Sequence, residues 1–184
     1  AKSGKADNTL VIYLGDHGAQ FSRGKTSVYE AGLNIPLLIR CPRQGKKSLV
    51  RDGLVSTVDL LPTVLDVCGI ELPDESKLAG RSLVPLLKGE QPPWRDHLFA
   101  MTTGAAPALY YPQFSVRDER YKLIVSPDRE RENRSARAYL ERYNVHFAAG
   151  TSPEEIAAGG KNAKQSDETY LQPPAWERYD LQGA

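Results

Sequence analysis

The residues of this chain that are best suited to chemistry lie close together near its start. Asp16 and His17 directly follow an apolar run, and Lys25 comes shortly afterwards, next to Gly24. A carboxylate and an imidazole together suit Zn²⁺, Mn²⁺ or Fe²⁺ better than Ca²⁺ or Mg²⁺ on softness alone. A lysine between glycine and hydroxyl residues can clamp a sulfate or phosphate oxygen. The segment therefore predicts a site for a cation and an oxyanion.

Two glycines, Gly15 and Gly18, flank the two candidate ligands. Adjacent side chains of an extended strand point to opposite faces, so we expect the glycines to supply the backbone freedom that turns both ligands toward one ion. A simpler interpretation is open as well, in which Asp16 caps the next helix and His17 caps the loop. Lys25 without such neighbours would be an ordinary solvated lysine.

The elements that must position this loop include two apolar runs, residues 9–15 and 36–41. Neither run alternates apolar with polar residues, which is typical of strands covered on both faces in a parallel or mixed sheet. Residues 56–69 predict a helix, with a capping serine at the front, apolar positions at helical spacing and a glycine at the end. Pro62 should kink this helix unless the first turn begins only a residue or two earlier.

The second half of the chain has a different pattern. Polar and turn-forming residues after residue 71 place a boundary that divides the chain into residues 1–75 and 76–184. Segments rich in strand-forming residues then predict a small antiparallel sheet: 97–103, 114–126 as a hairpin, and 176–181. Residues 129–149 predict one long helix packed on that sheet, and residues 151–174 predict a surface segment.

Charge and composition restrict the partners. The 184 residues include 24 basic and 23 acidic ones, a net charge of +1, which attracts neither nucleic acid nor a membrane surface. No apolar stretch approaches the length of a membrane span. Arg117, Arg120 and Lys122 could line a cleft for a sulfated glycan, although alternating charges on a hairpin more typically face solvent. Cys41 and Cys68 fit two buried thiols as well as one disulfide.

An ordered series of segments resembles the carboxyl-terminal half of a sulfatase of the alkaline phosphatase superfamily. The segments are DHG, GKTSVYEAG, PLLIRCP, LVSTVDLLPTVLDVCGI, AGRSLVPLLKGE and PWRDHLF. The late WERYDL stands where sulfatases typically read ELYDL, and residues 99–124 are most similar to the heparan N-sulfatase (sulfamidase) branch. The resemblance implies an α/β fold: the end of an alkaline-phosphatase-like mixed sheet domain, followed by a small α+β domain with an antiparallel sheet and a long helix.

The resemblance also implies a role for each candidate residue. Asp16 matches the aspartate that binds the active-site divalent cation, usually Ca²⁺, and His17 matches a neighbour that is Asn or His in the family. Lys25 matches the lysine that binds the sulfate and stabilises charge on it. We follow the family on calcium, because carboxylates from elsewhere in a full site would dominate the coordination.

The chain also departs from the family. Sulfatases use a formylglycine nucleophile made in a Cys or Ser, x, Pro, x, Arg motif, which this sequence lacks, so we expect it in a missing amino-terminal part. We therefore expect a fragment of an enzyme that hydrolyses sulfate esters or N-sulfates on glycosaminoglycan-like carbohydrate, inactive alone. Gly104, Ala105 and Ala106 stand where sulfamidases carry histidine and acidic side chains, which puts N-sulfoglucosamine specificity in question.

Two other functions are left open by the sequence. One is a phosphodiesterase or phosphonate hydrolase of the same superfamily, with a zinc pair at DHG; the other is a noncatalytic module that binds a glycan or a partner chain. The expected partner is a sulfated carbohydrate, and exposed sheet edges predict self-association or a homo-oligomer. The resemblance implies that the parent enzyme is exported, to the periplasm or the extracellular space.

Overall fold

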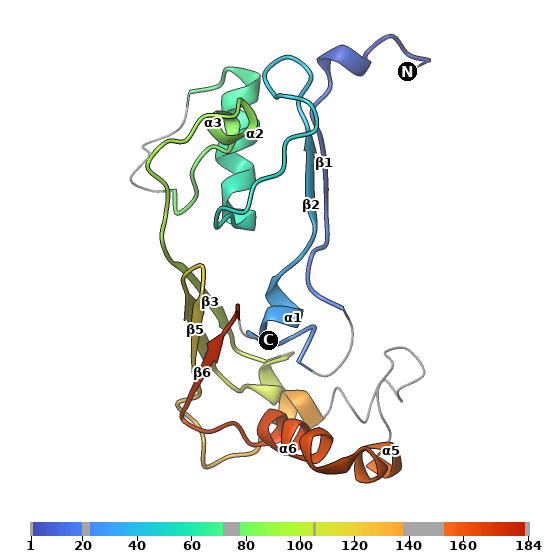
Figure 1. The fold of residues 1–184 in the computed structure, drawn as a ribbon, viewed down its shortest axis with the longest axis vertical. Coiled ribbons are helices and arrows are strands. Elements are labelled where there is room, and N and C mark those ends of the chain that lie inside the picture. The colour runs from blue at the N-terminus through green and yellow to red at the C-terminus, as the bar shows by residue number, and fades with distance from the viewer. Residues whose placement is uncertain (1, 20–22, 72–77, 105, 138–152, 183–184) are drawn as a thin grey trace. The chain divides into compact units, whose positions relative to one another are not determined.

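A computed structural model describes residues 2–19, 23–71, 78–104, 106–137 and 153–182, and Figure 1 shows its ribbon. Its elements are η1 (Ala6–Asn8), β1 (Val11–Leu14), α1 (Glu30–Leu33), β2 (Leu37–Arg40), η2 (Thr57–Asp59), α2 (Leu60–Cys68), α3 (Val84–Leu87), β3 (Leu98–Thr102), η4 (Pro107–Leu109), β4 (Gln113–Arg117), β5 (Tyr121–Val125), α5 (Pro153–Ala158), α6 (Gly160–Leu171) and β6 (Trp176–Asp180). The chain forms two compact units that interleave in sequence: residues 1–14 with 36–98, and residues 15–35 with 99–184. The predicted boundary between residues 75 and 76 lies inside the first unit.

In the first unit, β1 and β2 pair antiparallel, in a register that runs from Val11 opposite Arg40 to Leu14 opposite Leu37. Both strands were predicted to be covered on both faces, and this is wrong for the described residues. Exposed and half-buried side chains alternate along each strand, and Tyr13 and Leu38 are 63% and 64% exposed. The two strands form a two-stranded sheet of their own, so its second face has no covering layer among the described residues.

The helix predicted over residues 56–69 is confirmed as η2 followed by α2. Ser56 and Asp59 form a capping box at its start, and Gly69 ends it with a φ of 66°. Pro62 lies in the first turn of α2, where its missing amide hydrogen has no intrahelical partner to lose, so it causes no kink. Asp59 is fully buried and accepts two hydrogen bonds from the Arg95 guanidinium, at 2.7 and 2.5 Å.

The second unit contains a four-stranded sheet in the order β3-β4-β5-β6. The predicted hairpin is confirmed, because β4 and β5 pair antiparallel around a tight turn, and β6 pairs antiparallel with the other side of β5. One core cluster joins this sheet to the loop between β1 and α1 and to α6; its buried members are Val28, Tyr29, Ile124, Ala136 and Tyr170. The loop that carries the candidate ligands therefore belongs to the same core as the carboxyl-terminal sheet.

The helices of the second half differ from the prediction. Residues 134–137 are helical, as expected, but residues 129–133 form a turn and an irregular segment, so the prediction is wrong there. Residues 138–149 of the predicted helix lie outside the described residues. The segment over 151–174, predicted to lie at the surface, contains two helices that were not predicted, α5 and the 12-residue α6. The side chains of α6 other than Tyr170 are exposed or half-buried, as expected for a surface segment. Tyr170 near the end of α6 is 1% exposed, so burial of this ring against the core stabilises a helix whose other side chains are mostly polar. Among the described residues, no helix is long and apolar enough to cross a membrane.

The two cysteines are both free thiols. Cys41 is buried and Cys68, the last residue of α2, is exposed. The sequence had left a disulfide open, and the structure decides for the two thiols.

Candidate functional site

Asp16 and His17 lie one and two residues after Gly15, at the start of the loop that follows β1. The Asp16 Oδ2 atom is 3.5 Å from His17 Nε2, and the two side chains are 88% and 36% exposed. The Asp16 Oδ1 atom accepts a hydrogen bond from the His17 backbone amide at 3.0 Å. The helix that follows, α1, begins after Tyr29 without a side-chain cap, so the interpretation of Asp16 as a helix cap is wrong.

The ring of His17 is oriented by its own loop. Its Nδ1 atom lies 2.8 Å from the Gly18 carbonyl oxygen, and a carbonyl only accepts, so Nδ1 carries the hydrogen. In the neutral imidazole, the Nε2 atom therefore keeps its lone pair, on the side of the ring next to the Asp16 carboxylate. An anionic oxygen and a nitrogen lone pair at this separation fit two ligand positions of one divalent cation.

The glycines of this loop serve close packing. Neither Gly15 nor Gly18 is among the residues with positive φ, so neither uses the left-handed conformation that glycine favours. A Cβ atom on Gly18 would lie 1.7 Å from the Ala31 carbonyl oxygen, and one on Gly32 would lie 2.4 Å from the Gly24 carbonyl oxygen. The Gly18 amide donates to the Gly32 carbonyl at 2.9 Å. Only glycine allows these backbone segments to approach so closely.

Lys25 sits in a turn between two residues of unusual backbone conformation. Arg23 and Thr26 have φ values of 62° and 69°, in the left-handed region. The Lys25 amide donates to the Ala19 carbonyl at 2.9 Å, which closes the loop after the DHG segment, and the Lys25 side chain is half-buried. All three predicted residues thus belong to the same loop. The Asp16 and His17 side chains contact each other, and the Lys25 side chain forms no ion pair or hydrogen bond with either of them.

The described residues contain no complete metal centre. Nowhere among them do three or more His, Cys, Asp or Glu side chains gather around one point. Asp16 and His17 therefore fit a cation as two of its ligands, and the remaining ligands would have to come from outside the described residues or from water.

A carboxylate that sequence reasoning missed lies just after the loop. Glu30, the first residue of α1, accepts hydrogen bonds from Lys122 Nζ at 2.7 Å and from an Arg117 amino group at 2.5 Å. Lys122 is 1% exposed, so the interpretation of the hairpin charges as a solvated face is wrong for this residue. Burial lowers the pKa of Lys122, while the Glu30 carboxylate opposes that shift. Arg120 does face solvent, where it pairs with Asp180.

A second missed carboxylate lies on β6. Glu177 is 7% exposed and accepts hydrogen bonds from the hydroxyl groups of Tyr29 and Tyr179. Burial, with the Glu177 carboxylate adding to it, raises the pKa of both tyrosines well above the usual range. The sequence WERYD does not predict the contact between Glu177 and Tyr29, because the two residues are 148 positions apart in the chain.

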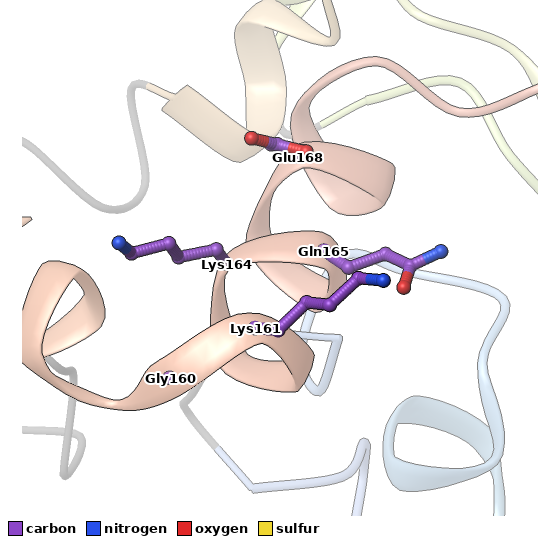
Figure 2. Close-up of a pocket in the computed structure, with 5 residues that line it drawn as sticks. All are labelled: Gly160, Lys161, Lys164, Gln165 and Glu168. Carbon is purple, nitrogen blue, oxygen red and sulfur yellow. The ribbon is translucent and has the colours of Figure 1, made fainter.

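The backbone conformation explains why residue 104 is a glycine. Gly104 has a φ of 100°, and a Cβ atom there would lie 2.3 Å from the Leu109 carbonyl oxygen. A longer side chain at residue 104 would therefore require the backbone to move. A shallow hollow lies along α6, away from the predicted site, and is lined by exposed side chains of that helix. Lys161 and Gln165 extend to one side and Lys164 to the other (Figure 2). None of the predicted site residues lies there.

Comparison with known proteins places this loop in a recognised sequence family. The family described as N-sulphoglucosamine sulphohydrolase, C-terminal, matches residues 15–133. An ulvan-active sulfatase of Formosa agariphila is 32% identical over 120 residues, 64% of this chain and 23% of the relative. Human N-sulphoglucosamine sulphohydrolase is 34% identical over 130 residues, 66% of this chain and 26% of the relative.

A solved structure is similar as well. It was determined in complex with its substrate, D-glucosamine-2-N,6-O-disulfate, and it superposes with a TM-score of 0.58 at 30% identity, over 69% of this chain and 27% of that one. The chain therefore spans about a quarter of the length of each of these three proteins.

Proposed function

The chain belongs to the sulfatase family, and from that premise we propose that its opening loop binds the cation and the sulfate group of a sulfated carbohydrate. The observation that carries the proposal is the contact between Asp16 and His17. With Nδ1 of the imidazole committed to a carbonyl, the Nε2 atom, which carries the lone pair, and a carboxylate oxygen lie 3.5 Å apart. The match of the family to residues 15–133 includes this whole loop.

Each residue has a distinct part in the proposed binding. Asp16 and His17 would hold a divalent cation, most simply Ca²⁺, and that cation would withdraw charge from the sulfate oxygens. Lys25 would bind the sulfate through its ammonium group and stabilise the charge that develops on the oxygens during hydrolysis. Gly18 and Gly32 hold the loop in shape by close packing.

The proposed substrate class is a sulfate ester or N-sulfate on a carbohydrate. Support comes from the relatives, which include a sulfohydrolase of N-sulphoglucosamine and a protein solved with a disulfated glucosamine. A Cβ atom at residue 104, where the resemblance implies larger side chains in the sulfamidase branch, would lie 2.3 Å from the Leu109 carbonyl oxygen, so we do not restrict the proposal to N-sulfates.

We also propose that this chain alone does not turn over its substrate. The sequence contains no Cys or Ser, x, Pro, x, Arg segment, and thus no precursor of a formylglycine nucleophile. The nucleophile would have to come from another part of the parent enzyme, so binding and turnover are separable in this chain.

The test is a calorimetric titration of the chain with D-glucosamine-2-N,6-O-disulfate, carried out with and without Ca²⁺. We expect saturable binding that weakens in Lys25→Gln, and weakened Ca²⁺ dependence in Asp16→Asn. The exposed Lys47→Gln has the same charge change and serves as the control. Equal binding by Lys25→Gln and Lys47→Gln would overturn the proposal, as would a preference for two Zn²⁺ ions and a phosphodiester.

A further inference from the structure

We infer that Tyr29 and Glu177 are positioning residues for Lys25: the carboxylate on β6 holds, through the Tyr29 hydroxyl, the strained turn that carries the lysine. This inference rests on the proposed function, because it takes Lys25 to be the sulfate ligand. It assigns a role to the last strand of the chain, none of whose residues belongs to the proposed binding site.

The turn around Lys25 needs support from its surroundings. The left-handed φ values of Arg23 and Thr26, 62° and 69°, are unfavourable for residues other than glycine, and such conformations persist only where neighbouring groups hold them. Local hydrogen bonds supply part of this support: the Lys25 amide donates to the Ala19 carbonyl at 2.9 Å, and the Ser27 amide donates to the Gly24 carbonyl at 3.2 Å. The Ser27 hydroxyl lies 2.6 Å from the Arg23 carbonyl oxygen, and the Thr102 hydroxyl lies 3.5 Å from the Thr26 carbonyl oxygen.

Support from a distant part of the chain comes from β6. The Tyr29 hydroxyl lies 2.9 and 3.1 Å from the two carboxylate oxygens of Glu177, and the two residues are only 5% and 7% exposed. The Tyr29 ring also meets the rings of Tyr170 and Tyr179 edge-on, at centroid distances of 6.2 and 6.1 Å. A buried carboxylate requires its donors, so this contact fixes the place of Tyr29.

The position of Tyr29 is passed on to the turn through Arg23. The Arg23 guanidinium lies 4.8 Å from the centre of the Tyr29 ring, a cation–π distance, and it donates to the Ser166 carbonyl oxygen on α6 at 3.3 Å. Arg23 is one of the two left-handed residues that flank Lys25. If the Tyr29 ring moved, Arg23 would lose this contact, and its left-handed conformation next to Lys25 would lose support.

The next element is held independently. Glu30 is fixed by Lys122 and Arg117, so α1 keeps its anchor on the sheet when the Tyr29 hydroxyl is removed. We therefore expect the effect of a Tyr29 substitution to stay within the turn around Lys25.

A matched pair of variants tests this inference in the full 184-residue chain. Tyr29→Phe and Tyr179→Phe each remove one hydroxyl donor from the same Glu177 carboxylate, but the Arg23 guanidinium lies over the Tyr29 ring, whereas it acts on Tyr179 through its charge. We expect the two variants to lose similar thermal stability. We expect Tyr29→Phe to raise the Kd for D-glucosamine-2-N,6-O-disulfate by about tenfold, the size of a typical outer-shell effect, and Tyr179→Phe to leave it within about twofold.

A second comparison shows whether the effect passes through Lys25. In a Lys25→Gln background, we expect Tyr29→Phe to cause no further change in the Kd. Equal Kd values for the two tyrosine variants, or an undiminished effect of Tyr29→Phe without the lysine, would overturn the inference. If Lys25→Gln by itself left the Kd unchanged, the proposed function would fail instead, so the two failures are distinguishable.

Discussion

Replacing Gly18 by alanine tests the close packing of the ligand-bearing loop. The added Cβ atom would lie 1.7 Å from the Ala31 carbonyl oxygen, half of an ordinary contact of 3.4 Å, and 2.8 Å from the Gly32 Cα. Both neighbours are backbone atoms, so the loop and α1 must separate, and the bond from the Gly18 amide to the Gly32 carbonyl is lost. Overpacking costs about 1–3 kcal/mol and a backbone hydrogen bond contributes about 1, so we expect a loss of about 2–4 kcal/mol.

The assay is the free energy of unfolding from urea denaturation, with Gly53→Ala as the control. A Cβ atom on Gly53 meets nothing within 4 Å, and its φ is not positive, so alanine there should be neutral or should stabilise by up to about 1 kcal/mol. Equal stability of the two variants would refute the steric reasoning, and the role of Gly18 would then have to lie elsewhere.

Three further predictions concern buried polar groups. Arg95→Ala should cost about 3–5 kcal/mol of unfolding free energy, because it leaves the fully buried Asp59 carboxylate without its ion pair; a loss below 1 kcal/mol in urea denaturation would contradict this. Thr63→Val should cost about 1–3 kcal/mol by the same measurement, because it leaves a buried backbone amide without its acceptor. Burial raises the pKa of Tyr29 and Tyr179. Stability should therefore be full below pH about 10 and fall above it, where tyrosines of the unfolded chain ionise; tyrosinate absorbance that rises for all tyrosines before unfolding would contradict this.

Local sequence signals predicted the elements that are built from local contacts. The Ser56 to Gly69 segment carries both of its caps within the helix, so its bounds could be predicted from the sequence. The hairpin of β4 and β5 follows from two short runs around Asp118, whose carboxylate accepts the amides of Arg120 and Tyr121 in the turn. α6 was missed, because its main stabilising contact is one buried ring, Tyr170, against residues from distant parts of the chain.

The same distinction holds for the candidate site. Asp16 and His17 are neighbours in sequence, so their proximity could be expected, and the hydrogen bond that orients the imidazole comes from the very next residue. Glu30 and Glu177 could not be predicted as anchors of the loop, because their partners lie 92 and 148 residues away in sequence. A single sequence gives no signal for a carboxylate whose partner is so distant.

The most direct test of the account is a crystal structure of the chain grown with Ca²⁺ and D-glucosamine-2-N,6-O-disulfate. We predict a cation at about 2.3–2.6 Å from an Asp16 carboxylate oxygen, with His17 Nε2 facing it and a sulfate group on the Lys25 ammonium. A cation and a sulfate bound elsewhere, with the Asp16, His17 and Lys25 side chains all facing solvent, would contradict the central claim.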